Sequence, residues 1–325
     1  MLDFFSRIGG FIMEPLYFVI SAVLVGFHKV FGNLFGEASG VAWVLSIIGL
    51  TLVIRMALIP LFVKQIKSSR NMQLIQPKVK ELQKKYGHDR ERLAQETMKL
   101  YKDTGTNPFA SCLPIILQMP IFFALFRLID QAAKEPETPR GLMTEKLNTQ
   151  FGDAIFLGAK ISDTFLNTDD WGVRVLAAVL VLAMTATTFL TQRQLMSKNM
   201  PADALTGPYA QQQKMLLYVL PVVFAVGGIA FPVGVLFYWT TSNLWTMGQQ
   251  FYVIRNNPAP NTEAYKAKAE RDKAKAARKG ISTEPTGSTA VVATEVVEAP
   301  VAPRPQPKRQ TKAQRQAKRK PPSKK

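Results

Sequence analysis

The chain has 325 residues, of which 47% are hydrophobic, yet its formal net charge is +18 and its pI is near 10.0. Its single cysteine, Cys112, excludes an intramolecular disulfide bond. The sequence contains no HExxH, GxSxG or phosphate-binding glycine loop. We therefore expect a protein that is not an enzyme and that uses no metal and no cofactor.

The first predicted element, residues 1–36, contains the apolar stretch "PLYFVISAVLVGF" at residues 15–27. This stretch is shorter than the roughly 20 apolar residues of a typical transmembrane helix. Two alternatives therefore stay open for it. The segment is either a short membrane span or a helix that lies in the membrane interface.

Five segments within residues 37–254 have the length and apolarity of membrane spans. They are residues 40–63, 109–129, 173–191, 215–231 and 233–253. Only a short turn separates the last two, which predicts a tight helical hairpin. The expected fold class is an all-α membrane protein with a five-helix transmembrane core, a cytoplasmic helical hairpin and a disordered basic C-terminal tail.

The cytoplasmic hairpin is predicted over residues 64–107. Apolar side chains recur there at steps of three and four residues, as on one face of an amphipathic helix, and residues 87–89 supply a turn before a second helix. We expect a lid or docking surface at the membrane; the alternative is a solvated hairpin that only spaces two spans. The residues assigned to this surface are Met72, Ile75, Pro77, Val79, Leu82 and Tyr86.

Loop charges orient the spans, because Lys and Arg are retained on the cytoplasmic side of a membrane. Residues 64–107 carry 11 Lys and Arg and residues 192–214 carry 3, whereas residues 131–170 carry 4 against 7 Asp and Glu. We therefore expect a multi-pass protein with residues 64–107, residues 192–214 and the C-terminus in the cytoplasm.

Arg55 is unusual because it lies inside the first predicted span. It precedes Lys64 by nine residues, which places it roughly 13 Å deep at about 1.5 Å per residue. An arginine near the bilayer centre costs about 2.5 to 3.5 kcal/mol on insertion scales. None of the five predicted spans has an Asp or Glu in its interior, and Glu14 is a remote candidate partner. We therefore expect a water-containing cavity around Arg55.

A positively charged cavity that reaches halfway through the membrane suits two functions. It lowers the barrier for a polar or acidic stretch of another polypeptide to enter the membrane part way, which is the task of an insertase. Alternatively, Arg55 is the binding charge of a small-anion transporter, although five core spans do not divide into two equal repeats. We favour the insertase, and we expect a transporter to tolerate deletion of the 64–107 hairpin.

Three stretches carry a resemblance to a known family. They are "QPKVKELQKKYG", "NPFASCLPIILQMPIFFALF" and "QQQKMLLYVLPVVFAVGGIAFPVGVLFYWTTSNLWTMGQQ". These stretches resemble the signature regions of the YidC/Oxa/Alb membrane protein insertases, in the short form without a large periplasmic domain. The similarity covers about residues 12–255.

The resemblance implies a bacterial plasma-membrane insertase and folding chaperone. Such a protein receives nascent membrane proteins in a hydrated, positively charged groove open to cytoplasm and lipid, alone or with the Sec translocon. The 64–107 hairpin would then face the signal-recognition machinery, with the signal-recognition particle receptor as a partner. The predicted substrate groove combines two residues of the first span with residues of the other spans. It comprises Arg55, Thr51, Gln118, Gln192, Tyr238, Trp239 and Ser242.

Residues 255–325 form the predicted basic tail. Residues 254–325 hold 18 Lys and Arg against 6 Asp and Glu, with almost no aromatic residues, so most of the segment cannot offset the entropy of ordering. Residues 264–279 can form a charged helix that continues from the last span. Three roles stay open for the tail: binding ribosomal RNA, binding anionic lipids, or anchoring the topology. The contact residues are Lys308, Arg309, Lys312, Arg315, Lys318, Arg319 and Lys320.

Overall fold

The computed structural model describes residues 2–105, 113–200 and 208–278. The chain divides into two units, residues 1–274 and residues 275–325, and the described part of the second unit is the last turn of one helix. The helices are α1 (Leu2–Phe35), α2 (Gly40–Ala57), α3 (Ile59–Tyr86), α4 (Arg90–Asp103), α5 (Leu113–Lys134), α6 (Glu145–Gly152), α7 (Trp171–Asn199), α8 (Pro208–Gly228), α9 (Val233–Asn256) and α10 (Glu263–Arg278). Two short strands, β1 (Ile155–Phe156) and β2 (Ala159–Lys160), pair antiparallel.

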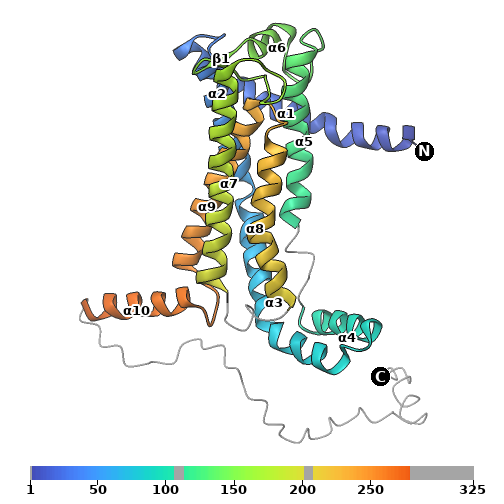
Figure 1. The fold of residues 1–325 in the computed structure, drawn as a ribbon, viewed down its shortest axis with the longest axis vertical. Coiled ribbons are helices and arrows are strands. Elements are labelled where there is room, and N and C mark those ends of the chain that lie inside the picture. Colours follow the sequence, from blue (N-terminus) through green and yellow to red (C-terminus); the bar gives the residue numbers. More distant parts are fainter. Residues whose placement is uncertain (1, 106–112, 201–207, 279–325) are drawn as a thin grey trace, which may run out of the picture. The chain divides into compact units, whose positions relative to one another are not determined.

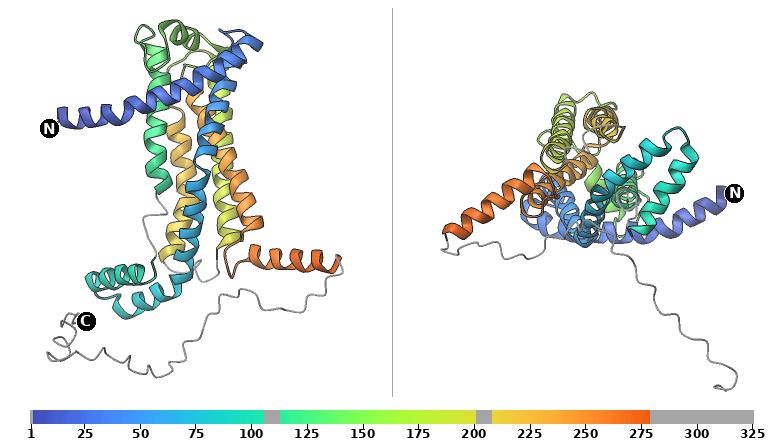
Figure 2. Two further views of the ribbon diagram at one scale, coloured as in Figure 1. Left: turned by 180° about the vertical axis from the view of Figure 1, so that it is seen from behind. Right: turned by 90° about the horizontal axis from the view of Figure 1, so that it is seen from below.

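The expected all-α membrane fold is confirmed. Helices α2, α5, α7, α8 and α9 run side by side as a bundle (Figures 1 and 2), in which α9 packs against α2, α5 and α7, and α7 also packs against α8. Fully buried apolar side chains fill the space between them, among them Trp43, Leu50, Leu125 and Leu236. The bundle therefore has one large apolar core, and Met196, Met200 and Leu217 form a second, smaller apolar cluster.

Four helical segments in the described chain are long and apolar enough to cross a membrane: Met13–Phe35, Gly40–Ala57, Ile116–Lys134 and Trp171–Asn199. Leu217–Gly228 is a shorter apolar helix. The segment expected as the last span forms α9, which at 24 residues and about 1.5 Å per residue is also long enough. It is not one of the four because polar residues such as Ser242, Asn243 and Gln249 lower its hydropathy.

The segment expected as the first span, residues 40–63, is not one helix. α2 ends at Ala57, and α3 begins at Ile59 with Pro60 in its first turn. Proline lacks the backbone N–H that a continuous helix would require at this point, so the chain restarts its hydrogen-bond ladder there. α3 then leaves the bundle and forms an antiparallel hairpin with α4.

α1 lies crosswise at one end of the bundle, packed on α2 and α5 (Figure 2). The same end of the bundle carries α6 and the β1–β2 hairpin. We call these two elements together the cap. The cap is tied to the start of α9, because Val233 N donates to Asp163 O at 2.9 Å and Gly234 N donates to Ile161 O at 2.8 Å. At Gly40 any side chain would collide with the backbone of Ile155, so glycine allows α2 to start directly against β1.

The charged helix expected after the last span exists as α10, but it does not continue α9. The chain turns at residues 257–262, which include Pro258 and Pro260 and place Asn261 at a φ of 59°. Proline cannot extend a helix, and a positive φ ends its backbone pattern. The Thr262 hydroxyl then accepts from Tyr265 N at 3.3 Å and caps the new helix.

Candidate functional site

A cavity of about 410 Å³ opens between α3 and four helices of the bundle, α2, α5, α8 and α9. Its wall combines polar side chains with aromatic and aliphatic ones. The lining residues are Arg55 from α2, Phe62 from α3, Gln118, Met119 and Phe122 from α5, Phe224 from α8, and Tyr238, Trp239, Ser242, Asn243 and Thr246 from α9. α9 contributes the largest share because its residues 238, 239, 242, 243 and 246 recur at helical spacing on one face.

Arg55 supplies the charge of this cavity. Its side chain is 9% exposed, and no carboxylate forms an ion pair with it in the part of the chain that the structure describes. The guanidinium carbon lies 6.0 Å from the centre of the Phe62 ring, which favours the cation through its negative face. A buried guanidinium without a carboxylate has unused capacity to bind an anion or a hydrogen-bond acceptor.

Tyr238 and Ser242 add polar atoms beside Arg55. The Tyr238 hydroxyl accepts a hydrogen bond from Gln118 Nε2, which fixes both side chains between α5 and α9. Ser242 lies one helical turn further along α9, and its buried hydroxyl adjoins that of Tyr238. The cavity thus offers a cation and buried hydroxyl groups to whatever enters it.

Aromatic rings form the apolar part of the same cavity wall. The Trp239 ring centre lies 5.0 Å from that of Phe224 and 5.3 Å from that of Phe122, with the rings edge to face in both pairs. Phe231 completes the cluster, 5.7 Å from Trp239. A polar group and an apolar segment could therefore be accommodated next to each other in one cavity.

Two of the predicted groove residues lie elsewhere. Thr51 is completely buried, and its hydroxyl donates to the Ile47 carbonyl at 2.7 Å inside its own helix. Gln192 belongs to α7 and does not line the cavity. The other five, Arg55, Gln118, Tyr238, Trp239 and Ser242, all do.

Sequence reasoning missed several lining residues. Thr246 was within reach, because it follows Ser242 by one turn of α9. Phe62, Phe122 and Phe224 carried no signal, since an apolar residue in a span can face lipid, core or cavity. Asn243 also ties α9 to α7, because its Nδ2 donates to Thr188 Oγ1 at 3.0 Å.

The predicted hairpin surface lies on α3. Ile75 and Val79 are each 8% exposed, Met72, Leu82 and Tyr86 are half-buried, and Pro77 is exposed. The Arg92 guanidinium of α4 sits over the Tyr86 ring at 5.2 Å and joins the two helices. The apolar face therefore packs within the hairpin, while Lys78, Lys84 and Lys85 remain exposed at its surface. The predicted tail contacts at residues 308–320 lie outside the described residues.

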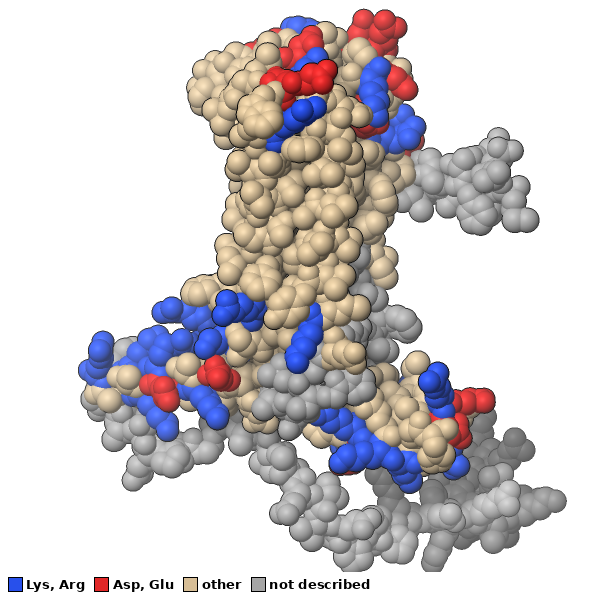
Figure 3. Space-filling model, in the orientation of Figure 1, with Lys and Arg blue, Asp and Glu red and all other residues tan. Residues whose placement is uncertain are grey.

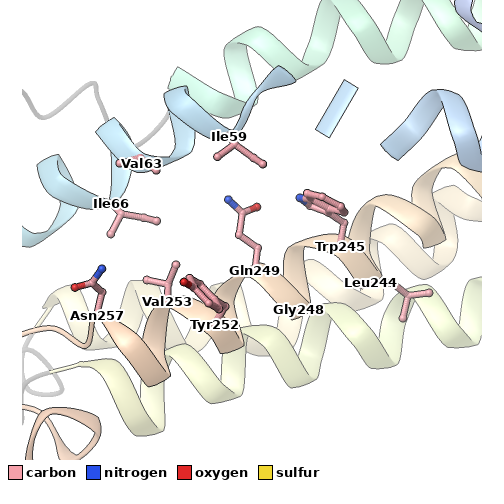
Figure 4. A pocket seen from close by; sticks show the side chains of 10 residues that line it. All are labelled: Ile59, Val63, Ile66, Leu244, Trp245, Gly248, Gln249, Tyr252, Val253 and Asn257. Carbon is pink, nitrogen blue, oxygen red and sulfur yellow. The ribbon is translucent and has the colours of Figure 1, made fainter. Parts of the chain in front are cut away.

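A second cavity of about 720 Å³ lies between α3 and the last turns of α9 (Figure 4). Ile59, Val63 and Ile66 face Tyr252 and Val253 across it. Two buried polar atoms at this cavity, Trp245 Nε1 and Gln249 Oε1, have no hydrogen-bond partner within the described ranges. This cavity carries no charge and is distinct from the one around Arg55.

Charged side chains are absent from the visible flank of the bundle (Figure 3), where the surface between the two ends is formed by uncharged residues. Lys, Arg, Asp and Glu gather at the cap end and at the opposite end, near α3, α4 and α10. Arg55 therefore lies within a helix whose surroundings are suited to lipid, which makes its polar cavity exceptional.

Comparison with known proteins relates the chain to one family. The family model described as "60Kd inner membrane protein" matches residues 34–262. The chain is 47% identical over 279 residues to the membrane protein insertase YidC of Streptomyces avermitilis, covering 83% of this chain and 64% of that protein. It is 39% identical over 288 residues to the membrane protein insertase YidC of Tropheryma whipplei strain Twist, covering 83% and 91%.

Among solved structures, an active YidC insertase with its first transmembrane domain resolved matches with a TM-score of 0.47 and 22% identity, covering 72% of this chain and 46% of that chain. The family match includes Arg55 and every other residue that lines its cavity. The chain therefore belongs to the 60Kd inner membrane protein family, together with the YidC membrane protein insertases that it matches.

Proposed function

We propose that this protein inserts other membrane proteins into the bacterial plasma membrane, and that the cavity around Arg55 receives the polar segment that must cross. The observation that carries the proposal is the buried Arg55 side chain, which no carboxylate neutralises among the described residues. A permanent internal ion pair would have filled the site. An unpaired cation instead favours a visiting acidic group.

Electrostatic attraction and the hydrophobic effect would together drive insertion of the client. In a poorly screened cavity, two opposite charges at 4 Å attract by about 4 kcal/mol at an effective dielectric constant of 20. The membrane potential then favours outward movement of negative charge by about 2.3 kcal/mol per charge per 100 mV. Transfer of the client's own span into lipid adds about 0.8 kcal/mol per buried CH₂ group. No bond is made or broken, so the process requires no catalytic residue.

The two characters of the cavity wall match the two parts of such a client. The acidic or polar tail would lie against Arg55 and Ser242, while the adjoining apolar segment would lie against the rings of Phe122, Phe224 and Trp239. Met119, which is 42% exposed, marks a side on which the cavity approaches the outer surface of the bundle. We infer that the client's span leaves toward lipid on this side.

The orientation follows from the charge distribution, and the partners are those that the family resemblance implies. The basic α3–α4 hairpin, residues 192–214 and the C-terminus would lie in the cytoplasm, where the hairpin meets the signal-recognition particle receptor. The tail residues 308–320 would bind ribosomal RNA or anionic lipid. Large clients would be received together with the Sec translocon, and small ones by this protein alone.

Site-specific photo-crosslinking tests the proposal. A photoreactive amino acid replaces Gln118 or Trp239 in the cavity, or Gln192 outside it, and a ribosome-bound nascent chain with an acidic N-terminal tail is presented to each variant. We expect crosslinks from positions 118 and 239 and few from position 192. Arg55→Glu should weaken the crosslinks from the cavity at least tenfold, because the attraction of about 4 kcal/mol becomes a repulsion.

An absence of crosslinks from both cavity positions, in protein that is folded in the membrane, would overturn the proposal. The small-anion transporter makes a different prediction: removal of the α3–α4 hairpin would leave transport intact. An insertase that receives clients through this hairpin should lose activity instead. Insertion assays and anion uptake in the same reconstituted vesicles separate the two functions.

A further inference from the structure

α10 is attached to the bundle at the end opposite the cap (Figure 1). Lys198 of α7 forms an ion pair with Glu263 at 3.0 Å, and Asn199 Oδ1 accepts from Ala259 N at 2.7 Å. The Arg271 guanidinium donates to the carbonyl of Arg255, near the end of α9, at 2.6 Å. These contacts hold the first part of α10 crosswise to α9, as both side views show (Figures 1 and 2).

The contacts also define which face of α10 is turned toward the bundle. Glu263, Ala264, Ala267 and Arg271 line a cavity of about 360 Å³ with the end of α9. At 100° per residue, Lys268, Lys275 and Arg278 share the helix face of Ala264 and Arg271, because residues 264, 268, 271, 275 and 278 follow one another at steps of four and three. We call Lys268, Arg271, Lys275 and Arg278 the basic stripe.

The acidic residues of α10 lie mostly away from this stripe. Glu263 is paired with Lys198 and Glu270 lies outside the stripe, whereas Asp272 lies at its edge, four residues after Lys268 and three before Lys275. Lys266 and Lys273 lie on the opposite face, together with Ala269. The face of α10 that is turned toward the bundle therefore carries net positive charge, with four basic residues and a single carboxylate, that of Asp272, at its edge.

The stripe is positioned at the edge of the apolar surface. In the last turns of α9, Phe251 is 53% exposed and Tyr252 is 67% exposed, which is typical of the belt where aromatic side chains meet lipid headgroups. Figure 3 shows the uncharged flank of the bundle ending where the basic residues of α10 begin. A helix that lies crosswise at this level turns one face to the headgroup layer and the other to water.

We propose that α10 lies on the cytoplasmic surface of the membrane and binds anionic phospholipid headgroups through Lys268, Arg271, Lys275 and Arg278. The occupant is lipid rather than ribosomal RNA, because the stripe is on the face turned toward the bundle and not on the face turned away from it. The inference uses the orientation given under the proposed function, but it does not depend on insertase activity.

Lipid contact can be measured with full-length protein in vesicles. In a Cys112→Ser background, a fluorophore is placed on Ala267→Cys, toward the bundle, or on Ala269→Cys, on the opposite face. Quenching by headgroup-spin-labelled phosphatidylglycerol is compared with quenching by the matching phosphatidylcholine. We expect stronger quenching by phosphatidylglycerol at position 267 only, and its loss in 1 M salt, where the screening length is about 3 Å.

Matched charge variants assign the effect to the stripe. Lys268→Gln/Lys275→Gln and Lys266→Gln/Lys273→Gln each remove two charges at the same spacing. At about fivefold per basic residue near an anionic surface, the first pair should lower the preference for phosphatidylglycerol roughly 25-fold. The second pair should change it less than threefold, which would show that position on the helix matters and net charge does not.

Three results would overturn the proposal. They are equal quenching at positions 267 and 269, equal effects of the two double variants, and a stripe variant that weakens ribosome binding while lipid quenching persists. The last result would assign the stripe to RNA. Arg55→Glu serves as an independent control, since it should impair insertion while leaving the lipid preference of α10 unchanged. A failure of the proposed insertase function is thereby distinguished from a failure of the proposed lipid binding by α10.

Discussion

Charged side chains in and around the cap form ion pairs, whereas Arg55 in the cavity has no carboxylate partner among the described residues. In and around the cap, Lys146 lies 2.9 Å from Glu37 and Lys160 lies 3.3 Å from Asp153. In the cavity, Arg55 is far more buried than any of these residues, yet no carboxylate in the described chain pairs with it. Exposed ion pairs contribute about 0 to 1 kcal/mol, so the cap gains little from them. An unpaired internal charge costs several times more and is retained, which indicates a role in function and not in stability.

Trp43→Ala should produce the largest effect on stability. Trp43 is completely buried beneath the cap, stacks on His28 with ring centres 3.6 Å apart and meets Phe151 edge to face at 5.2 Å. Its truncation should lower the free energy of unfolding by about 3 to 5 kcal/mol. Thermal unfolding in detergent measures this loss. The crosslinking pattern of the cavity should survive at temperatures where the variant is folded, and a selective loss of those crosslinks would show that the two regions are not separate.

Arg55→Leu should raise the free energy of unfolding, whereas Trp43→Ala lowers it. Replacing an unpaired guanidinium by an apolar side chain removes part of its cost in the membrane, so the free energy of unfolding should rise by about 1 to 3 kcal/mol. Insertion of clients with acidic tails should fall at the same time. Parallel unfolding and insertion assays check both halves; a variant that loses stability would indicate that Arg55 has a structural partner.

Tyr238→Phe tests the polar wall of the cavity. Without the hydroxyl, Gln118 Nε2 loses its acceptor. A fully buried unsatisfied donor costs about 1 to 3 kcal/mol, and the half-buried Gln118 amide should cost less. Ser46→Ala is a suitable control, because the Ser46 hydroxyl donates to the Ala42 carbonyl within its own helix at 2.6 Å and does not line the cavity. We expect several-fold weaker insertion with Tyr238→Phe and unchanged insertion with Ser46→Ala.

The smallest effect concerns the cap. The hydrogen bond from Lys146, followed by that from Gln150, holds the pKa of Glu37 below its usual value. A carboxylate with a lowered pKa in the folded state adds stability above its unfolded pKa of about 4.5, and this contribution is lost as the pH falls through the folded value. Glu37→Gln should therefore reduce the loss of thermal stability below pH 4.5. Identical pH profiles for the variant and the parent would contradict this assignment.

The pattern of apolar residues predicted the elements well where one periodicity dominates. The spacing from Met72 to Tyr86 implied a helix face, and Ile75 and Val79 are indeed buried on α3. The restart of the chain at Leu58 was not anticipated, although Pro60 is visible in the sequence, because hydropathy continues unbroken across it. Hydropathy indicates whether a segment is suited to lipid or to water, but it does not show where the backbone hydrogen bonds of a helix are interrupted.

The cavity was harder to predict because sequence spacing identifies a helix face but not the neighbour of that face. Arg55 could be located from its charge alone. Thr51, on the same helix, instead bonds to its own backbone, since a hydroxyl in an apolar helix can satisfy itself four residues back. The phenylalanines of the wall depend on how α5, α8 and α9 are packed, which no local pattern records.

A charge swap between Arg55 and its client tests the central claim most directly. Insertion is measured in vesicles without a membrane potential, for clients with an acidic or a basic N-terminal tail, with the parent protein and with Arg55→Glu. If Arg55 receives the tail by charge, the parent should favour the acidic tail, and Arg55→Glu should favour the basic tail by at least tenfold, since the sign of an interaction of about 4 kcal/mol is reversed. The same preference for the acidic tail in both proteins would contradict the account.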